Sequence, residues 1–334
     1  MMQSNTFFST YASIFRKNAV SLSPLFKILI FNTDVMKKFL FLSTMLLVAL
    51  MAQAQSLKVC PKMKKGDVKT YVTVTQTNAA GTEVKLTETA TYTVTEETAA
   101  GYVIDVVVNN CTTDAAADNL MGRLLTASSE MMKGVTLRLT TDKDGQIVGI
   151  KNFDEVKKAT QERAGLFFDE LLKSAPQMAD VMPKEVLMKQ VAGQLTEGYM
   201  VNAAKLSNSP LALNGKTVVI GAQDEYTNDQ GMKMKRMYFL AGNNKVTTTS
   251  TMNMSKEEMK QMIIDKVSEM APDQADMVKQ NIDMVMASGM MKLEATEKAN
   301  YELDANGWVK SITVENETNS MGQKVKINAT VTLQ

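Results

Sequence analysis

The sequence predicts an α+β protein: antiparallel, curved β-sheet with helical segments inserted between strands, organised as two related halves. Three observations predict this fold class. Apolar and polar residues alternate with period two over many short segments, glycine-marked turns separate these segments, and helical spacing of apolar residues appears between them. Two stretches with this order of elements follow one another along the chain, which indicates the two halves.

The first half begins at Gly66. Its expected strands are 68–75, 84–94, 102–108, 135–141 and 147–150. An N-cap at Asp118 and apolar residues at helical spacing predict a helix over 120–132. After the Asp-Gly turn that ends at Gly145, helices are expected from 152 or 154 to 171 and from Pro183 to about 195.

The second half restarts the same order at Gly215. Its expected strands are 216–226, 232–240 and 245–254, and two or three more fill 292–334. Ser255 and Glu258 form a capping box that opens a helix. Pro272 interrupts this helix, and a second helix ends at Gly289.

A shared local signature indicates an internal duplication. Asp142-x-Asp144-Gly145-x-Ile147-x-x-Ile150 corresponds to Asp304-x-Asn306-Gly307-x-Val309-x-x-Ile312. We therefore expect one unit over 55–205 and a related unit over 206–334, either as separate domains or as one continuous domain. The alternative is that β-rich proteins reuse the same tight turns by chance.

Residues 36–54 have the three parts of a secretory signal peptide. Basic residues follow Met36, an apolar run covers 39–50, and an Ala-Gln-Ala cleavage pattern ends at Ala54. A membrane span would need roughly 20 apolar residues, so none is expected to remain after cleavage. We expect an exported protein, in the periplasm or outside the cell, with 1–35 as a mis-assigned upstream extension or an unusually long n-region.

Composition restricts the chemistry. None of the 334 residues is histidine, which removes the commonest general base and zinc ligand, so no enzyme, metal site or cofactor is expected. Catalysis by carboxylates alone is the alternative that this composition leaves open. Residues 1–54 hold five basic and one acidic side chain, and their removal changes the net charge from +1 to −3. That balance argues against nucleic acid. The Asp-Gly and Asn-Gly turns resemble calcium loops, but Lys151 and Thr313 stand where the bidentate Glu is required.

The two cysteines leave a disulfide undecided. Export to an oxidising compartment favours a bridge between Cys60 and Cys111. A three-strand meander would instead separate them by roughly 30 Å, at ~3.3 Å per residue. Leu57-Lys58-Val59 before Cys60 is unlike the small-residue box of a bacterial lipoprotein, so the mature protein is expected to have no lipid anchor and to be soluble.

Methionine is unusually frequent, at 27 residues. Methionine fills irregular cores, and it also lines surfaces that accept varied apolar partners. The functional hypothesis makes 255–289 a lid whose apolar side chains face a groove for a lipid or an apolar peptide. These residues are Met259, Met262, Ile263, Met270, Met277 and Met284. The alternative is a structural or interaction protein of the cell envelope, in which the same residues are simply core.

The export signal, the strand meanders, the D-x-[DN]-G-x-[IV]-x-x-I hairpins and the threonine-rich strands resemble secreted β-rich proteins of unknown function from Bacteroidetes. More distantly, a meander covered by helices is similar in outline to the half-barrel lipoprotein carriers of the LolA and LppX type. The first resemblance implies no active residues, and the second concerns the fold alone.

Overall fold

The structure is a computed structural model that describes residues 56–79, 81–116, 120–174, 176, 183–228, 231–270, 272–287, 293–320 and 323–334. The predicted signal peptide and the segment before it lie outside the described residues. Ser56–Gln334 form one compact unit, so the boundary predicted between 205 and 206 falls inside a single body.

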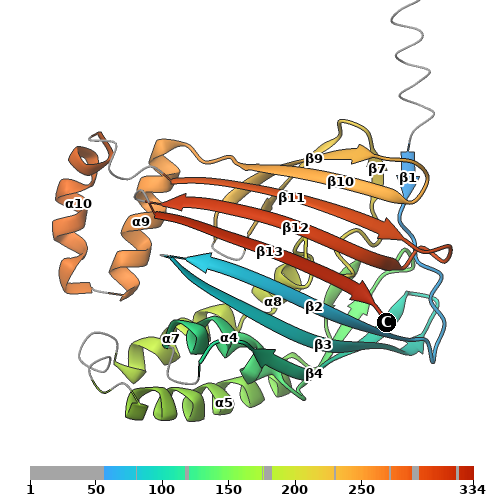
Figure 1. Ribbon diagram of the computed structural model, residues 1–334, viewed down its shortest axis with the longest axis horizontal. Coiled ribbons are helices and arrows are strands. Elements are labelled where there is room, and N and C mark those ends of the chain that lie inside the picture. The colour runs from blue at the N-terminus through green and yellow to red at the C-terminus, as the bar shows by residue number, and fades with distance from the viewer. Residues whose placement is uncertain are drawn as a thin grey trace, which may run out of the picture. The chain divides into compact units, whose positions relative to one another are not determined.

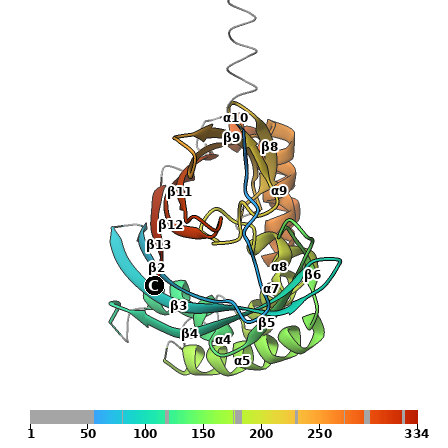
Figure 2. The ribbon, with the colours of Figure 1, turned by 90° about the vertical axis from the view of Figure 1, so that its right-hand side faces the viewer.

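Eleven strands form one antiparallel, curved sheet, which confirms the predicted α+β class (Figures 1 and 2). Their order across the sheet is β6-β5-β4-β3-β2-β13-β12-β11-β10-β9-β8. The strands of the first part are β2 Val68–Ala79, β3 Thr82–Glu97, β4 Tyr102–Thr113, β5 Thr136–Thr141 and β6 Ile147–Ile150. Those of the second part are β8 Gln223–Thr227, β9 Lys233–Leu240, β10 Lys245–Met252, β11 Leu293–Leu303, β12 Val309–Ser320 and β13 Gln323–Leu333.

Six helices are described; five follow the strands as the sequence predicts, and α8 was not predicted. Their bounds are α4 Leu120–Met132, α5 Phe153–Ser174, α7 Lys184–Gln194, α8 Glu197–Ala203, α9 Lys256–Met270 and α10 Pro272–Ala287. The capping box at the start of α9 is confirmed, because the Ser255 N–H donates to Glu258 Oε2 (2.9 Å) and the Glu258 N–H donates to Ser255 Oγ (3.2 Å). An ion pair with Lys233 and hydrogen bonds from the Ser255 N–H and hydroxyl to the carboxylate lower the pKa of Glu258 to about 2.

One predicted strand is wrong. The segment 216–226 breaks at Gly221, which has a φ of +76° that favours glycine. The part before the break is β7 (Thr217–Val219), which pairs with β1 (Ser56–Lys58) in a separate two-stranded sheet. The part after the break is β8 in the main sheet. Strand-forming residues occur on both sides of Gly221, so residue preference alone did not reveal the turn.

The two hairpins that carry the shared signature have the same local structure. Asp142 Oδ1 accepts the N–H groups of Asp144 and Gln146, and Asp304 Oδ1 accepts those of Asn306 and Trp308. Each hairpin also has a register shift immediately before its aspartate. The equivalence of the turns is therefore observed, whereas superposition of the complete halves stays a prediction.

The segment 59–63, called the strap below, follows β1 and lies against both turns. Lys62 donates its N–H to the Asn306 carbonyl (2.8 Å). A Cβ atom at Gly307 would lie 3.1 Å from Pro61 Cα, and one at Gly145 would lie 3.0 Å from Met63 Cε. Both glycines have positive φ, so the turn conformation and the close approach of the strap require glycine at the same two positions.

The loop 204–216, which connects α8 to β7, packs against the concave face of the sheet. Leu211 and Leu213 are 2% and 0% exposed. Leu211 packs with Val94 and Trp308 in one apolar cluster. Leu213 packs in a second cluster, with Tyr301 of β11. The loop thus joins the two cores of the molecule.

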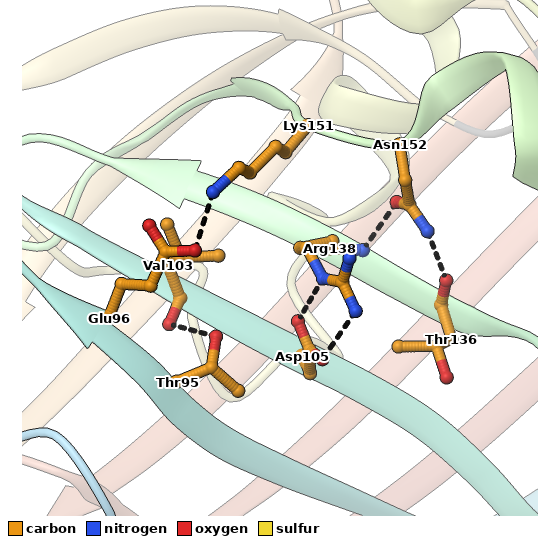
Figure 3. Close-up of polar contacts among 8 residues, drawn as sticks. All are labelled: Thr95, Glu96, Val103, Asp105, Thr136, Arg138, Lys151 and Asn152. Carbon is orange, nitrogen blue, oxygen red and sulfur yellow. Dashed lines mark hydrogen bonds and ion pairs between the residues drawn. The ribbon is translucent and has the colours of Figure 1, made fainter.

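Asn152 fixes the start of α5 against the sheet (Figure 3). Its side-chain oxygen accepts the Arg138 N–H (2.9 Å), and its side-chain nitrogen donates to the Thr136 carbonyl (2.8 Å). The Asn152 side-chain amide therefore continues the hydrogen bonding along β5 beyond the end of β6. Arg138 also pairs with Asp105 through two hydrogen bonds, of 2.9 and 3.2 Å, which ties β5 to β4.

We predict that Asn152→Ala destabilises the protein by about 1–3 kcal/mol, because a part-buried backbone donor and a carbonyl lose their partners together. Asn110→Ala, an exposed asparagine in β4, is the matched control and should change stability by no more than about 0.5 kcal/mol. Denaturant melts of both variants measure the difference. Equal effects of the two substitutions would contradict this role of Asn152.

Candidate binding cavity

A cavity of about 400 Å³ lies between the first part of the sheet and the helices that follow it. Strands β2–β5 supply one wall, α4, α5, α7 and α8 supply the other, and the loop after α8 closes one side. Its lining residues are Thr73, Glu88, Tyr92, Val106, Met131, Met132, Leu137, Leu139, Thr160, Val191, Gln194, Leu195, Tyr199, Met200, Ala203, Ala204, Asn208, Ser209 and Leu211.

The walls of this cavity are mainly apolar. Alternation along the strands directs Leu137 and Leu139 of β5 to the cavity, while Arg138 between them pairs with Asp105. Met131 and Met132 at the end of α4 and Met200 of α8 cover the opposite side. Methionine side chains are flexible and polarizable, so these three can adapt to the shape of an apolar molecule.

The polar side of the cavity is formed by β2 and β3. Thr73 and Glu88 are cross-strand partners, and Tyr92 follows Glu88 on the same face of β3. Burial raises the pKa of Tyr92, and the nearby Glu88 carboxylate raises it further. The Tyr92 ring also packs edge-on against Tyr71, with 5.4 Å between the centroids. Its hydroxyl therefore stays protonated, and its ring stays fixed beside Glu88.

A polar cluster occupies the concave face of the second part of the sheet. Lys216 Nζ and the Tyr238 hydroxyl both donate to Asp224 Oδ2, at 2.7 and 2.6 Å. Burial alone would raise the pKa of Asp224, but these two hydrogen bonds outweigh it and lower the pKa. Burial lowers the pKa of Lys216. Arg236 is 2% exposed, and its guanidinium carbon lies 3.9 Å from the centroid of the Tyr226 ring.

The loop 204–216 separates this cluster from the cavity. Ser207 donates to Glu297 (2.5 Å) and accepts at its carbonyl a hydrogen bond from the Tyr301 hydroxyl (2.9 Å). The next two residues, Asn208 and Ser209, line the cavity. The concave face thus has an apolar site under the first part of the sheet and a charged, largely internal network under the second.

The methionine lid predicted from the sequence is not where the cavity lies. Met259 is buried and Ile263 is half-buried, while Met262 packs against Met232, Met234 and Ala295 at the start of β9 and of β11. Met277 and Met284 are 58% and 70% exposed, so they face solvent and not an enclosed apolar space. The side chain of Met270 lies outside the described residues. None of the six is among the described lining residues of the cavity.

The cysteines are free thiols. The Cys60 thiol donates to Asp144 Oδ1 (3.5 Å) beside the β5–β6 turn, and Lys58 pairs with the same oxygen at 2.7 Å. Cys111 is buried near the far end of β4, opposite Glu88. Burial, with Glu130 and Glu88 nearby, raises the pKa of Cys111 to about 11. Cys60 lies beside the β5–β6 turn, near the start of β4, whereas Cys111 lies near the end of β4. The two thiols are therefore at opposite ends of the sheet, and the disulfide that the sequence left undecided is absent.

Sequence reasoning found several of the cavity residues without finding the cavity. Met131 and Met132 belong to the apolar face expected for 120–132, and Leu137 and Leu139 lie in an expected strand. Tyr199 and Met200 lie in α8, which was not predicted. A local pattern shows which residues point away from solvent, but it does not show where the packing of helices on the sheet leaves a cavity.

No family model matches this chain, and no curated protein matches it. A solved structure described as showing lipid–protein interactions in lipovitellin is similar, with a TM-score of 0.36 and 9% sequence identity over 82% of this chain. The chain spans 25% of the length of that structure. At this level the likeness does not define a function. Among the helices of the described residues, none is long and apolar enough to span a membrane.

Proposed function

We propose that this protein is an exported binding protein that holds an apolar ligand in the cavity under β2–β5. The observation that carries the proposal is the cavity itself. Its volume of about 400 Å³ lies within the range of roughly 300–1,000 Å³ that is typical of small-molecule sites. Apolar walls with a few polar groups on one side are also typical of such sites.

The driving force for binding is the transfer of apolar surface out of water. Each methylene buried against Leu137, Leu139, Met131 or Met200 contributes about 0.8 kcal/mol. A single chain of methylenes has few polar groups to satisfy, so the apolar walls suit an alkyl or acyl chain. The methionines let the same walls accept chains of different length or branching.

A binding role is proposed in preference to catalysis. The chain has no histidine, and Glu88 is the one carboxylate among the described lining residues. General acid–base catalysis usually needs a second titratable group within hydrogen-bond reach of the reacting atoms. A structural or interaction role is the alternative, and the exposed Met277 and Met284 of α10 are the observation that favours it.

We predict that the purified mature protein, residues 55–334, binds the neutral fluorescent probe N-phenylnaphthylamine and enhances its emission. Ala203→Trp should weaken this binding by about tenfold or more, because Ala203 lines the cavity and is itself exposed, so the larger ring can enter the cavity without replacing core atoms. Met277→Trp places the same ring on the exposed face of α10 and should leave binding unchanged.

Fluorescence titrations of the three proteins, with thermal melts to confirm folding, give the comparison. No probe binding by the parent protein would refute the proposed function. Loss of binding in Met277→Trp but not in Ala203→Trp would instead move the site to the helical hairpin α9–α10.

Export is the second part of the proposal, supported by the signal sequence that ends at Ala54. We predict that the protein recovered from the cell envelope or the medium begins at Gln55, because small residues precede the cleavage point. N-terminal sequencing of the recovered protein is the measurement. Protein that is found in the cytoplasm with residues 36–54 still attached would contradict export.

A further inference from the structure

We propose that Glu88 selects the head group of the ligand, so that the cavity takes apolar molecules that end in a protonated amine and disfavours those that end in a carboxylate. This inference rests on the proposed function and deepens it, because it names the chemical class of the ligand. Three features of the cavity carry it: its charge, the surroundings of Glu88 and the position of Tyr92.

Glu88 is the one charged side chain among the described lining residues of the cavity. Its other polar lining residues are neutral hydroxyl and amide groups, from Thr73, Thr160, Gln194, Tyr199, Asn208 and Ser209. No lysine or arginine is among the described lining residues. A cavity that holds fatty acids by their carboxylates would be expected to present a cation or several donors to that group. This one presents a carboxylate.

Glu88 has no cationic partner of its own in the described part of the chain. It is half-buried, and no hydrogen bond or ion pair reaches its carboxylate there. Its cross-strand neighbours are Thr73 on β2 and Cys111 on β4, both uncharged. Arg163, the arginine of α5, donates to the carbonyls of Met131 and Lys133.

A partly buried carboxylate without a partner costs free energy, because its hydration is reduced and nothing replaces it. An ammonium group of a ligand would supply both the opposite charge and N–H donors. Charge-assisted hydrogen bonds of this kind are stronger than those between neutral groups. A ligand carboxylate in the same place would instead add a like charge at short range, which weakens its binding.

Tyr92 provides a second interaction for the same cation. Glu88, Ala90 and Tyr92 point to one face of β3, and both Glu88 and Tyr92 line the cavity. An ammonium group within about 6 Å of a tyrosine ring is attracted to its face. The edge-on contact with Tyr71 holds the Tyr92 ring in place. The carboxylate and the ring therefore recognise a cation together.

The first test needs only the parent protein. Bound N-phenylnaphthylamine is displaced by dodecylamine, dodecanol or dodecanoate, which share one alkyl chain and differ in the head group. We expect dodecylamine to displace the probe at a concentration about tenfold lower than dodecanoate, with dodecanol between them. Equal displacement by the amine and the acid, or stronger displacement by the acid, would overturn the proposal.

The second test assigns the preference to Glu88. Glu88→Gln keeps the shape of the side chain and removes its charge, so the amine and the acid should displace the probe at similar concentrations. Glu83→Gln is the matched control, because Glu83 is an exposed residue of the same strand, on its opposite face, and does not line the cavity. It should keep the preference of the parent protein.

The outcomes separate this inference from the proposed function. Probe binding without a head-group preference leaves an apolar binding protein and removes the role of Glu88. A preference that persists in Glu88→Gln, or that Glu83→Gln also abolishes, likewise overturns it. Absence of probe binding contradicts the proposed function itself. If Glu88→Gln does not fold, the competition among the three ligands on the parent protein still decides the preference.

Discussion

Backbone hydrogen bonds between β2 and β13 join two strands from opposite ends of the described chain, with Ala79 facing Val325 and Tyr71 facing Leu333. Without this pairing the molecule would be two separate meanders, each with an open edge in the middle of the present sheet. The pairing makes one surface of eleven strands, and the right-handed twist of a sheet of that width gives it curvature. The concave side exists only because of this junction (Figure 2).

Contacts around the junction reinforce it. The Tyr71 hydroxyl donates to the Val309 carbonyl (2.8 Å) from within the buried core, and the Gln334 N–H donates to the Thr70 carbonyl (2.9 Å). Thr73 also lies on β2, where it faces Val331 of β13 on one side and Glu88 of β3 on the other. The pairing that closes the sheet therefore also places the polar side of the cavity.

Much of this fold could be predicted from the sequence, because strands, turns and caps are local. Alternation over 84–94, the Asp-Gly turn at Gly145 and the capping box at Ser255 were each predicted and found. The β2–β13 junction could not be predicted in this way, since no local pattern says which distant strands pair. The exposure of Met277 could not be predicted from the sequence either. Helical spacing identifies a stripe, but only the packing of α10 shows that this residue faces solvent.

The two parts of the concave face have different chemistry, and the loop 204–216 lies between them. Under β8–β11 the charges of Lys216 and Asp224 are paired internally, which suits a structural network. Under β2–β5 the walls are apolar, and the Glu88 carboxylate is left for something outside the chain. The likeness of the two Asp-Gly and Asn-Gly hairpins therefore does not extend to the side chains on the concave face beside them.

The position of a bound chain tests the central claim most directly. A crystal of the mature protein grown with dodecanol brominated at its terminal carbon would locate that carbon by the anomalous scattering of bromine. We predict a bromine peak within van der Waals contact of Met131, Leu139 or Met200, between the sheet and the helices. A peak beside Met277 and Met284 on α10, or a cavity without a peak in a crystal where the ligand is bound elsewhere, would contradict the account.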